Sequence, residues 1–182
     1  MAGEVKDPGA RAGDRRSARW DDHREARRAE LVAAAVAAID AHGPTASISQ
    51  MAAAAGVSKP VLYRYFADKD DLYRAVGQWG AHEVLGALLP VLRSAAGIRE
   101  KIDEGCREYL RIIDAHPQVF FLLVEHRTAD DPLAGGKELI AAAFARSMVD
   151  VFRRLGIDAA GAEPWAHGVV GLGLSQDRKS VV

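Results

Sequence analysis

The chain has 182 residues, of which 49% are hydrophobic, and this suits one large or two small globular domains. Its formal net charge is −1 at pH 7, so composition gives no global sign of a polyanionic partner, and any nucleic-acid site must be a local feature. The single cysteine, Cys106, excludes an intramolecular disulfide and a thiolate metal cluster.

The apolar residues indicate neither membrane insertion nor export. No apolar run approaches the length of a bilayer span, and the first residues lack the apolar centre of a signal peptide, so we expect a cytoplasmic protein. Apolar residues recur mostly at spacings of three and four, and no β-branched alternation is sustained, which predicts an all-α fold. In such a fold we expect Cys106 to be a small buried residue on a helix.

Residues 1–21 are rich in Gly, Arg, Asp and Ala and carry almost nothing to bury. Such a segment cannot offset its own ordering entropy, so we expect a flexible basic arm. Mobile arginines beside a DNA-reading module can reach phosphates or a minor groove. They also serve solubility alone in many proteins, and the sequence leaves both interpretations open.

The next helices carry their own start and stop signals. A first amphipathic helix is expected from Asp22 to His42. Ser47 and Gln50, three residues apart, predict a capping box for a short second helix that ends near Gly56.

A third helix is expected to open at Ser58 and to run through Phe66. Asp68 then caps a longer fourth helix, which is expected to bend at Pro90. The spans expected for the remaining helices are Ile98–His116, Pro117–His126, Leu133–Leu155 and Pro164 onward.

The stretch GVSKPVLYRYFADKDDL concentrates aromatic and basic residues around the third helix. With Leu62 at the centre of the buried face, a step of about 100° per residue places Phe66 inside as well. The positions that then face outward, or lie at the rim, are Pro60, Val61, Tyr63, Arg64 and Tyr65. Such a face is too apolar and too aromatic to serve only as a contact with water.

The second helix, the glycine turn and the third helix have the proportions of a helix-turn-helix, whose second helix enters the DNA major groove. Arg64 has the donors for guanine or phosphate, and Lys69 lies near free backbone N–H groups that favour a phosphate. The alternative is that the tyrosines pack between helices, while the two basic residues only pair with Asp68, Asp70 and Asp71.

The segment SISQMAAAAGVSKPVLYRYFADKDDLYRAV, from Ser47 to Val76, resembles the N-terminal DNA-binding domain of the tetracycline-repressor (TetR) family. The resemblance is carried by the A-G-V-S turn, a short helix ending in Y-x-[HY]-F, and a helix start of the form K-x-x-L. It implies an all-α homodimer with a three-helix head, followed by a C-terminal ligand domain whose occupancy alters DNA affinity.

Applied residue by residue, the resemblance implies two sets of DNA contacts. The phosphate contacts fall to Ser47, Ser58, Tyr63, Tyr65 and Lys69. The groove-facing set is Lys59, Pro60, Val61 and Arg64. Many relatives have glycine and threonine where this chain has Pro60 and Val61, so a base preference does not carry over.

The second half of the chain offers apolar helices with a few polar groups. One stripe that we expect to be buried consists of Ile98, Ile102, Cys106, Tyr109 and Ile113. The segment from His116 to Arg127 is apolar nearly all round and is expected in the middle of a bundle. We expect a cavity for a small apolar ligand, lined by Trp79, His82, Tyr109, Phe120, Phe121, Phe144 and Met148. The alternative is that these are ordinary core aromatics and surface histidines.

The last helix, PWAHGVVGLGL, sets three glycines among apolar residues. Each costs about 1 kcal/mol relative to alanine within a helix, which close approach of another helix would offset. The resemblance implies dimer packing here. The following residues, SQDRKSVV, abandon the amphipathic pattern where relatives usually carry a further helix, so we expect a truncated or altered C-terminus.

Known catalytic motifs are absent from the sequence. It has no histidine pair at i,i+4 spacing, no Glu-x-x-His repeat and no glycine loop after a strand. We therefore expect no enzyme activity, no cofactor and no metal site.

The favoured interpretation is a TetR-like repressor that binds a near-palindromic DNA operator as a homodimer and responds to a small apolar ligand. Its expected domains are the arm (1–21), the helix-turn-helix domain (22–74) and the ligand-binding and dimerisation domain (75–182). The alternatives are a helical ligand-binding protein without DNA-binding activity and an all-α enzyme.

Overall fold

The computed structural model describes residues 8–125, 132–156 and 158–174. These residues form helices joined by turns, without a strand, and this confirms the all-α fold. The helices are α1 (Pro8–His42), α2 (Ile48–Ala54), α3 (Lys59–Leu62), α4 (Lys69–Arg93), α5 (Ile98–Ala115), α6 (Pro117–Glu125), α7 (Ala134–Leu155) and α8 (Ala162–Leu174).

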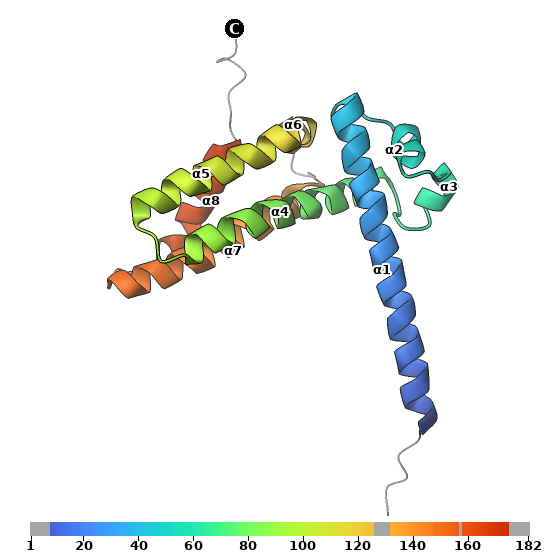
Figure 1. The fold of residues 1–182 in the computed structure, drawn as a ribbon, viewed down its shortest axis with the longest axis horizontal. Coiled ribbons are helices and arrows are strands. Elements are labelled where there is room, and N and C mark those ends of the chain that lie inside the picture. Colours follow the sequence, from blue (N-terminus) through green and yellow to red (C-terminus); the bar gives the residue numbers. More distant parts are fainter. Residues whose placement is uncertain (1–7, 126–131, 157, 175–182) are drawn as a thin grey trace, which may run out of the picture.

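The molecule has two parts, which we call the head (residues 8–76) and the body (residues 77–174). The head contains α1, α2, α3 and the start of α4, and the body contains the rest of α4 with α5 to α8 (Figure 1). Helix α4 runs unbroken through both parts and across the predicted domain boundary between residues 74 and 75. The division of the chain into two domains therefore stays a prediction. The two parts share helix α4, which joins the head to the body.

The predicted start of the first helix at Asp22 is wrong, because α1 begins at Pro8. Its N-terminal part extends away from the rest of the molecule (Figure 1), and Trp20 is 73% exposed there. Burial of its large aromatic side chain therefore does not hold the helix at Trp20. Proline fits a first helical turn, the segment is rich in alanine and arginine, and extending an existing helix adds one hydrogen bond per residue fixed. Residues 1–7 of the expected arm lie outside the described residues.

The start signals of α2 and α4 work as predicted. The Ser47 hydroxyl accepts from the Gln50 backbone N–H at 3.3 Å, and the Gln50 side chain accepts from the Ser47 N–H at 2.7 Å. Before α4, the Asp68 carboxylate accepts from the Asp71 N–H at 2.7 Å. The turn after α2 uses Gly56, whose φ of 64° is costly for any residue with a β-carbon.

Helix α3 is shorter than predicted. Only Lys59–Leu62 is α-helical, although the prediction ran through Phe66. The next residues continue with tighter bonds, such as those from the Arg64 N–H to the Val61 carbonyl and from the Tyr65 N–H to the Leu62 carbonyl. These i→i−3 bonds are typical of a helix end that tightens before the chain turns, here toward the cap of α4.

The core of the head is formed by one side chain cluster from all of its helices. Its largest fully buried members are Leu31, Ile39, Met51, Leu62, Phe66, Leu72 and Val76. Val119 and Leu122 of α6, together with Leu133, belong to the same cluster. The body therefore contributes directly to the core that supports α3.

In the body, α4 packs against α5 and α7, and α7 packs against α8. Helices α4 and α7 cross near Gly77 and Gly136, where a β-carbon added at Gly136 would overlap the carbonyl group of Gly77. Glycine at this position allows the two backbones to touch.

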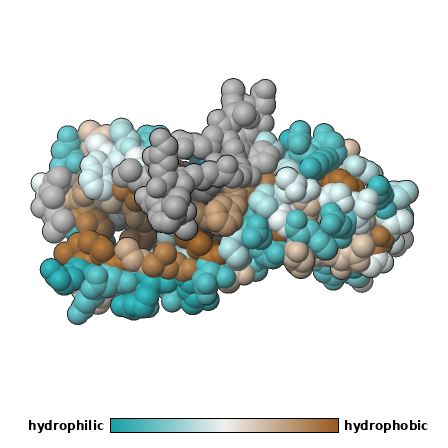
Figure 2. Space-filling view, turned by 90° about the horizontal axis from the view of Figure 1, so that it is seen from above, coloured by the Kyte–Doolittle hydropathy of each residue, from teal (hydrophilic) through white to brown (hydrophobic). Residues whose placement is uncertain are grey.

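Helix α5 corrects two expectations. None of its residues is buried, whereas we expected one face to be. Ile98 is 72% exposed, Ile102 57% and Leu110 61%, and Cys106 is exposed as well. The physical reason is that, within the described residues, α5 packs extensively against α4 and α6 and against no other helix to a similar extent. Figure 2, which views the molecule from above, shows a hollow in its left half, with apolar side chains around the hollow and a hydrophilic border below it.

From Pro117 to Leu122, helix α6 is buried on one side only, whereas we expected it in the middle of a bundle. Val119 and Leu122 are buried, but Phe121 is 51% exposed. His126, at the predicted end of this helix, lies outside the described residues.

Candidate nucleic-acid interface and ligand region

The short helix α3 separates a buried side from an exposed side, as the helical period predicted. Leu62 and Phe66 are each 1% exposed, and Tyr63 is 47% exposed. Lys59, Pro60 and Arg64 are also exposed, while Val61 and Tyr65 are half-buried. Pro60 stands in the first turn of the helix, where it costs no hydrogen bond.

The turn between α3 and α4 is held by Arg28 of α1, which the sequence analysis did not single out. Its guanidinium donates to the Asp71 carboxylate at 3.2 Å, and its carbon Cζ lies 4.6 Å from the centre of the Phe66 ring. Asp71 also accepts from the Ala67 N–H at 3.0 Å. The sequence contains a pattern that indicates this buried role. Arg28 is a charged residue three positions before Leu31, and it therefore lies on the apolar stripe of α1.

Asp68 and Asp71 pair with arginines other than Arg64. Asp68 and Asp71 each lie 3.8 Å from the Arg74 guanidinium. Among the described residues Arg64 forms no ion pair, and the Lys69 ammonium lies 4.9 Å from the centre of the Tyr73 ring instead. The structure therefore does not show the alternative arrangement, in which the aspartates pair with Arg64 and Lys69. For Tyr65 the alternative holds in part, since its ring packs against the head core.

The two serines differ in what their hydroxyl groups do. Ser47 is fully engaged in its capping box, with its hydroxyl also 2.7 Å from the Gln50 side-chain oxygen. Ser58 stands at the N-cap of α3, is exposed, and makes no side-chain cap bond. Its hydroxyl group is the more accessible of the two for an added acceptor.

In the body, the structure brings three of the seven predicted ligand residues together. The Tyr109 and Phe120 rings lie 6.5 Å apart in an edge-to-face arrangement, and Phe120 and Phe121 lie 6.5 Å apart as well. Tyr109 is half-buried, and this partial loss of solvent raises the pKa of its hydroxyl, so the side chain remains a neutral phenol over a wide pH range.

Two of the other four residues have ring contacts of their own. Trp79 contacts the His116 ring at 5.0 Å, and the exposed His82 ring bonds to the Gln78 carbonyl at 2.7 Å. Phe144 and Met148 are half-buried on α7. None of the seven residues lines the groove between α4 and α7 or the hollow between α7 and α8. The prediction of one common cavity stays a prediction.

A polar contact joins the head to the body. The Nδ1 atom of His116, between α5 and α6, lies 2.6 Å from the Asp40 carboxylate near the end of α1. The other carboxylate oxygen of Asp40 is buried and has no hydrogen-bond partner among the described residues. Because a buried polar atom without a partner is costly, the position of His116 relative to α1 affects the stability of this joint.

Two packed helices that present a short third helix, with basic and aromatic side chains facing solvent, define a helix-turn-helix DNA-binding protein. Residues 31–76 match the family described as "Bacterial regulatory proteins, tetR family". The uncharacterized HTH-type transcriptional regulator Rv0472c of Mycobacterium tuberculosis is 34% identical over 161 residues, which cover 87% of this chain and 69% of that protein. The chain therefore belongs to the TetR family and is a DNA-binding transcriptional regulator.

Two further similarities extend over most of the chain. The HTH-type transcriptional activator FasR of Mycolicibacterium smegmatis is 28% identical over 158 residues, covering 85% of this chain and 72% of the activator. The crystal structure of a TetR-family transcriptional regulator from Syntrophomonas wolfei superposes with a TM-score of 0.64 at 14% identity, covering 81% of this chain and 79% of that one. The latter similarity shows the fold alone.

Family membership also decides between the function classes left open by the sequence. TetR-family proteins are regulators and not enzymes, which confirms the prediction of a non-enzyme and disfavours a helical protein without DNA-binding activity. In the described part of the chain, no helix is both long and apolar enough to cross a bilayer. The same residues contain no group of three or more His, Cys, Asp and Glu side chains arranged for a metal ion.

Proposed function

We propose that this regulator acts in the cytoplasm as a homodimeric repressor, which binds a near-palindromic operator through two copies of α3 and releases it when a small apolar ligand enters the body. The observation that carries the DNA-binding part is the exposed side of α3. Lys59, Tyr63 and Arg64 face solvent there, while Leu62 and Phe66 hold the helix on the head core. Arg64 has no acidic partner among the described residues.

The individual contacts follow from these positions. Lys59, Pro60, Val61 and Arg64 form the groove-facing set, and Arg64 is the residue that reads a base edge. Its guanidinium is exposed and unpaired, which suits a two-bond contact with guanine.

The phosphate contacts fall to Ser58, Tyr63, Lys69, Tyr65 and Ser47. Ser58 and Tyr63 have accessible hydroxyl groups and Lys69 is exposed. The half-buried ring of Tyr65 and the capping bonds of Ser47 leave these two the weaker contacts.

The homodimer is supported by α8. Trp165 is 63% exposed on this helix, and β-carbons added at Gly168 and Gly171 would meet no atom within 4 Å. Glycine in a helix costs about 1 kcal/mol relative to alanine, and no neighbour among the described residues offsets this cost. A second copy of α8 packed closely against the same face would do so.

The ligand response is supported by the position of α6. Its residues Val119 and Leu122 belong to the head core, while Phe120 and Phe121 form the aromatic cluster together with Tyr109. A ligand bound against these rings would shift α6, and with it the contact between His116 and Asp40. Ligand and DNA would then oppose each other through one conformational equilibrium.

A DNA-binding titration over a range of salt concentrations tests the function. The protein is titrated against the DNA upstream of its own gene and against unrelated DNA, with fluorescence anisotropy as the readout. Binding of the upstream DNA should be tighter, and both affinities should fall steeply as salt rises. Equal and salt-insensitive binding of both DNA molecules would contradict the proposal.

Three variants separate the roles of individual side chains. Arg64→Ala should cost about 1–3 kcal/mol on the operator and relax its sequence preference. Tyr63→Phe and Lys69→Ala should weaken binding similarly on all DNA, and Lys69→Ala should also flatten the salt dependence. Arg107→Ala, on α5 and paired with Glu104, is the matched control and should bind DNA like the unchanged protein.

A further inference from the structure

The residues proposed to contact DNA lie on both sides of one tight turn. Tyr63, Arg64 and Tyr65 come before this turn. Lys69 comes after it, at the start of α4. Any movement of the turn therefore moves the arginine and the lysine together. A hydrogen bond to a base edge tolerates a range of only about 0.5 Å in its donor–acceptor distance, so recognition of a sequence needs a fixed turn.

Helix α3 has little stability of its own with which to fix this turn. Only four of its residues are α-helical, and Ser58 provides no side-chain cap. So short a helix is unfavourable to nucleate, and its orientation must come from contacts with other elements. Leu62 and Phe66 hold it on the head core, but the hydrophobic effect is non-directional. Directed contacts have to come from polar side chains.

Arg28 of α1 supplies three directed contacts. Its Nη2 atom donates to the Asp71 carboxylate at 3.2 Å, and its Nε atom donates to the Tyr65 carbonyl at 3.5 Å. Its Cζ atom lies 4.6 Å from the centre of the Phe66 ring, within the range of a cation–π interaction. One side chain thus reaches the end of α3, the ring that anchors the turn and the start of α4.

The contact with the Tyr65 carbonyl satisfies the end of α3. The last carbonyl groups of a helix have no partner within it, and an arginine side chain can bond to them from outside. Asp71 acts in the same way on the other side of the turn, since its second carboxylate oxygen accepts from the Ala67 N–H at 3.0 Å. The pair of Arg28 and Asp71 therefore links the end of α3 to the first turn of α4.

Burial separates a positioning role from a direct contact with DNA. The side chains of Arg28 and Asp71 are 26% and 24% exposed, so this guanidinium is mostly enclosed and already paired. Arg64 is by contrast exposed, and it has no acidic partner among the described residues. Arg28 is therefore placed to hold the site and not to touch the duplex.

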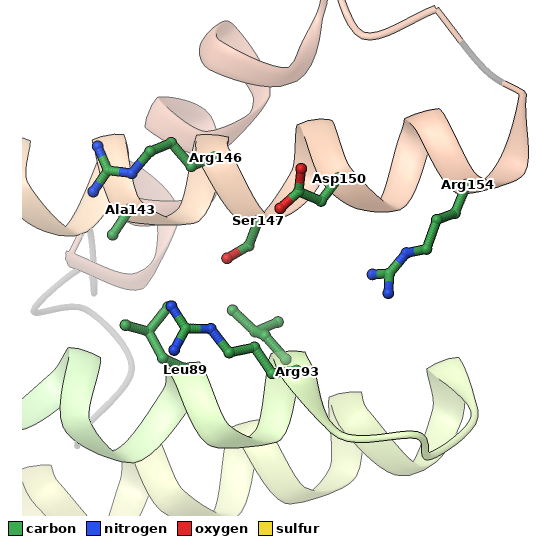
Figure 3. A pocket seen from close by; sticks show the side chains of 8 residues that line it. Leu89, Arg93, Ala143, Arg146, Ser147, Asp150 and Arg154 are labelled. Atoms are coloured by element: carbon green, nitrogen blue, oxygen red, sulfur yellow. The ribbon is translucent and has the colours of Figure 1, made fainter.

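Arginines elsewhere in the molecule are held by fewer partners. Figure 3 shows the Arg154 side chain extending from α7 into the space that separates α7 from α4, and among the described residues it forms no ion pair. Arg107 and Arg111 of α5 each pair with one glutamate on the same helix. Arg28 instead contacts three groups beyond its own helix, which fixes the plane of its guanidinium as well as its position.

We infer that Arg28 is a positioning residue for DNA recognition, which sets the orientation of α3 on the head and thereby the sequence preference of Arg64. Loss of its guanidinium frees the turn and lets α3 adopt several orientations, of which only one places Arg64 at a base edge. Phosphate contacts carry no sequence information and persist on any DNA. The effect on sequence preference rests on the proposed function, in which α3 reads the operator, whereas the holding of the turn depends on the head alone.

Hydrogen–deuterium exchange of the free protein tests the holding of the turn. Arg28→Met keeps a long side chain over Phe66 and removes the guanidinium. The matched control is Arg27→Met, which removes a charge that pairs with Glu30. Exchange of the turn amides, above all that of Ala67, should become about fivefold faster in Arg28→Met, the effect of one lost hydrogen bond. Exchange in α2 should stay unchanged in both variants. Unchanged exchange at the turn in Arg28→Met would overturn the inference.

DNA binding of the same variants tests the consequence, at a temperature at which circular dichroism shows each variant to be folded. Arg28→Met should bind the operator about tenfold more weakly, because a well-placed arginine discriminates against a wrong base by that factor or more. Its binding to unrelated DNA, and the salt dependence of that binding, should match those of Arg27→Met. A purely structural role would lower stability and leave the ratio of operator to unrelated binding unchanged in the folded variant, and that result would contradict the inference.

Arg28→Lys is the conservative variant, and it replaces Arg28→Met in both experiments if the latter fails to fold. Lysine keeps the charge beside Asp71 but lacks the planar fork that reaches the Tyr65 carbonyl and stacks on Phe66. This variant should therefore retain only part of the operator preference of the unchanged protein. Full retention would show that charge alone matters, and it would refute positioning by the guanidinium.

The two measurements distinguish this inference from the proposed function. Faster exchange at the turn of Arg28→Met, in a protein that shows no operator preference even when unchanged, would refute the proposed repressor and support the holding of the turn. Operator preference in the unchanged protein, kept in full by folded Arg28→Met, would support the repressor and refute the inference.

Discussion

The head and the body use similar amphipathic helices but bury them to different degrees. In the head, side chains from α1, α2, α3 and α4 meet in one cluster, whose large members such as Phe66 and Leu72 are almost fully buried. In the body, α5 has no buried residue although its apolar stripe is well formed. An amphipathic pattern specifies which face of a helix seeks a partner, but only the opposing elements determine whether that face is covered.

The largest expected difference between the two regions is the effect of removing one phenylalanine from each. Phe66→Ala should lower the free energy of unfolding by about 3–5 kcal/mol, because it opens a cavity in the head core and removes the ring beneath Arg28. Phe121→Ala, at a half-exposed position in the body, should cost about 1 kcal/mol or less. Denaturant unfolding of both variants measures this, and equal losses would mean that the two regions do not differ as described.

A second substitution tests the helix crossing that supports the body. Gly136→Ala places a methyl group against the Gly77 carbonyl and should cost about 1–3 kcal/mol, measured as a lower midpoint of thermal unfolding. Gly135→Ala is the matched control one residue earlier, where an added β-carbon meets no atom within 4 Å. This control should leave stability unchanged or raise it by up to about 1 kcal/mol.

The joint between head and body is open to a double-mutant cycle. Asp40→Ala and His116→Ala should show a coupling energy of about 1–2 kcal/mol, because their side chains share a hydrogen bond. The cycle also separates this bond from the contact of the His116 ring with Trp79. Asp40→Ala combined with His82→Ala is the control, since His82 bonds to its own helix, and these two effects should add.

The smallest expected effect is a pH dependence in the body. The bond from His167 to the Glu163 carbonyl, followed by its contact with the Glu138 carboxylate, raises the pKa of His167. Both ring nitrogens face acceptors, so the protonated ring is favoured in the folded state. The stabilisation is present below the ordinary histidine pKa and is lost as pH rises through the raised value.

Thermal unfolding of the His167→Gln variant as a function of pH measures this contribution. The unchanged protein should lose slightly more stability than the variant as the pH rises past neutrality. Glu138→Gln, which retains the bond to the Glu163 carbonyl, should remove only part of the difference. Identical profiles for the unchanged protein and His167→Gln would show that the histidine contacts contribute nothing.

Much of the candidate DNA site was predictable because its signals are local. The capping box at Ser47, the cap at Asp68 and the turn at Gly56 each depend on a few neighbouring residues, and the structure has all three. The burial of Leu62 and Phe66 follows from the helical period alone. By contrast, the support that Arg28 gives this site joins residues far apart in the chain, and only the fold brings them together.

The sequence by itself determined that the chain is helical, where most helices of the head and body begin or end, and which side of α3 faces outward. Hydrogen bonding within a turn and a repeat of 3.6 residues are properties of neighbouring residues. Tertiary structure alone decided that α5 leaves its apolar stripe exposed and that α4 and α7 touch at Gly77 and Gly136. Each of these depends on which distant element lies opposite, and no local pattern contains that information.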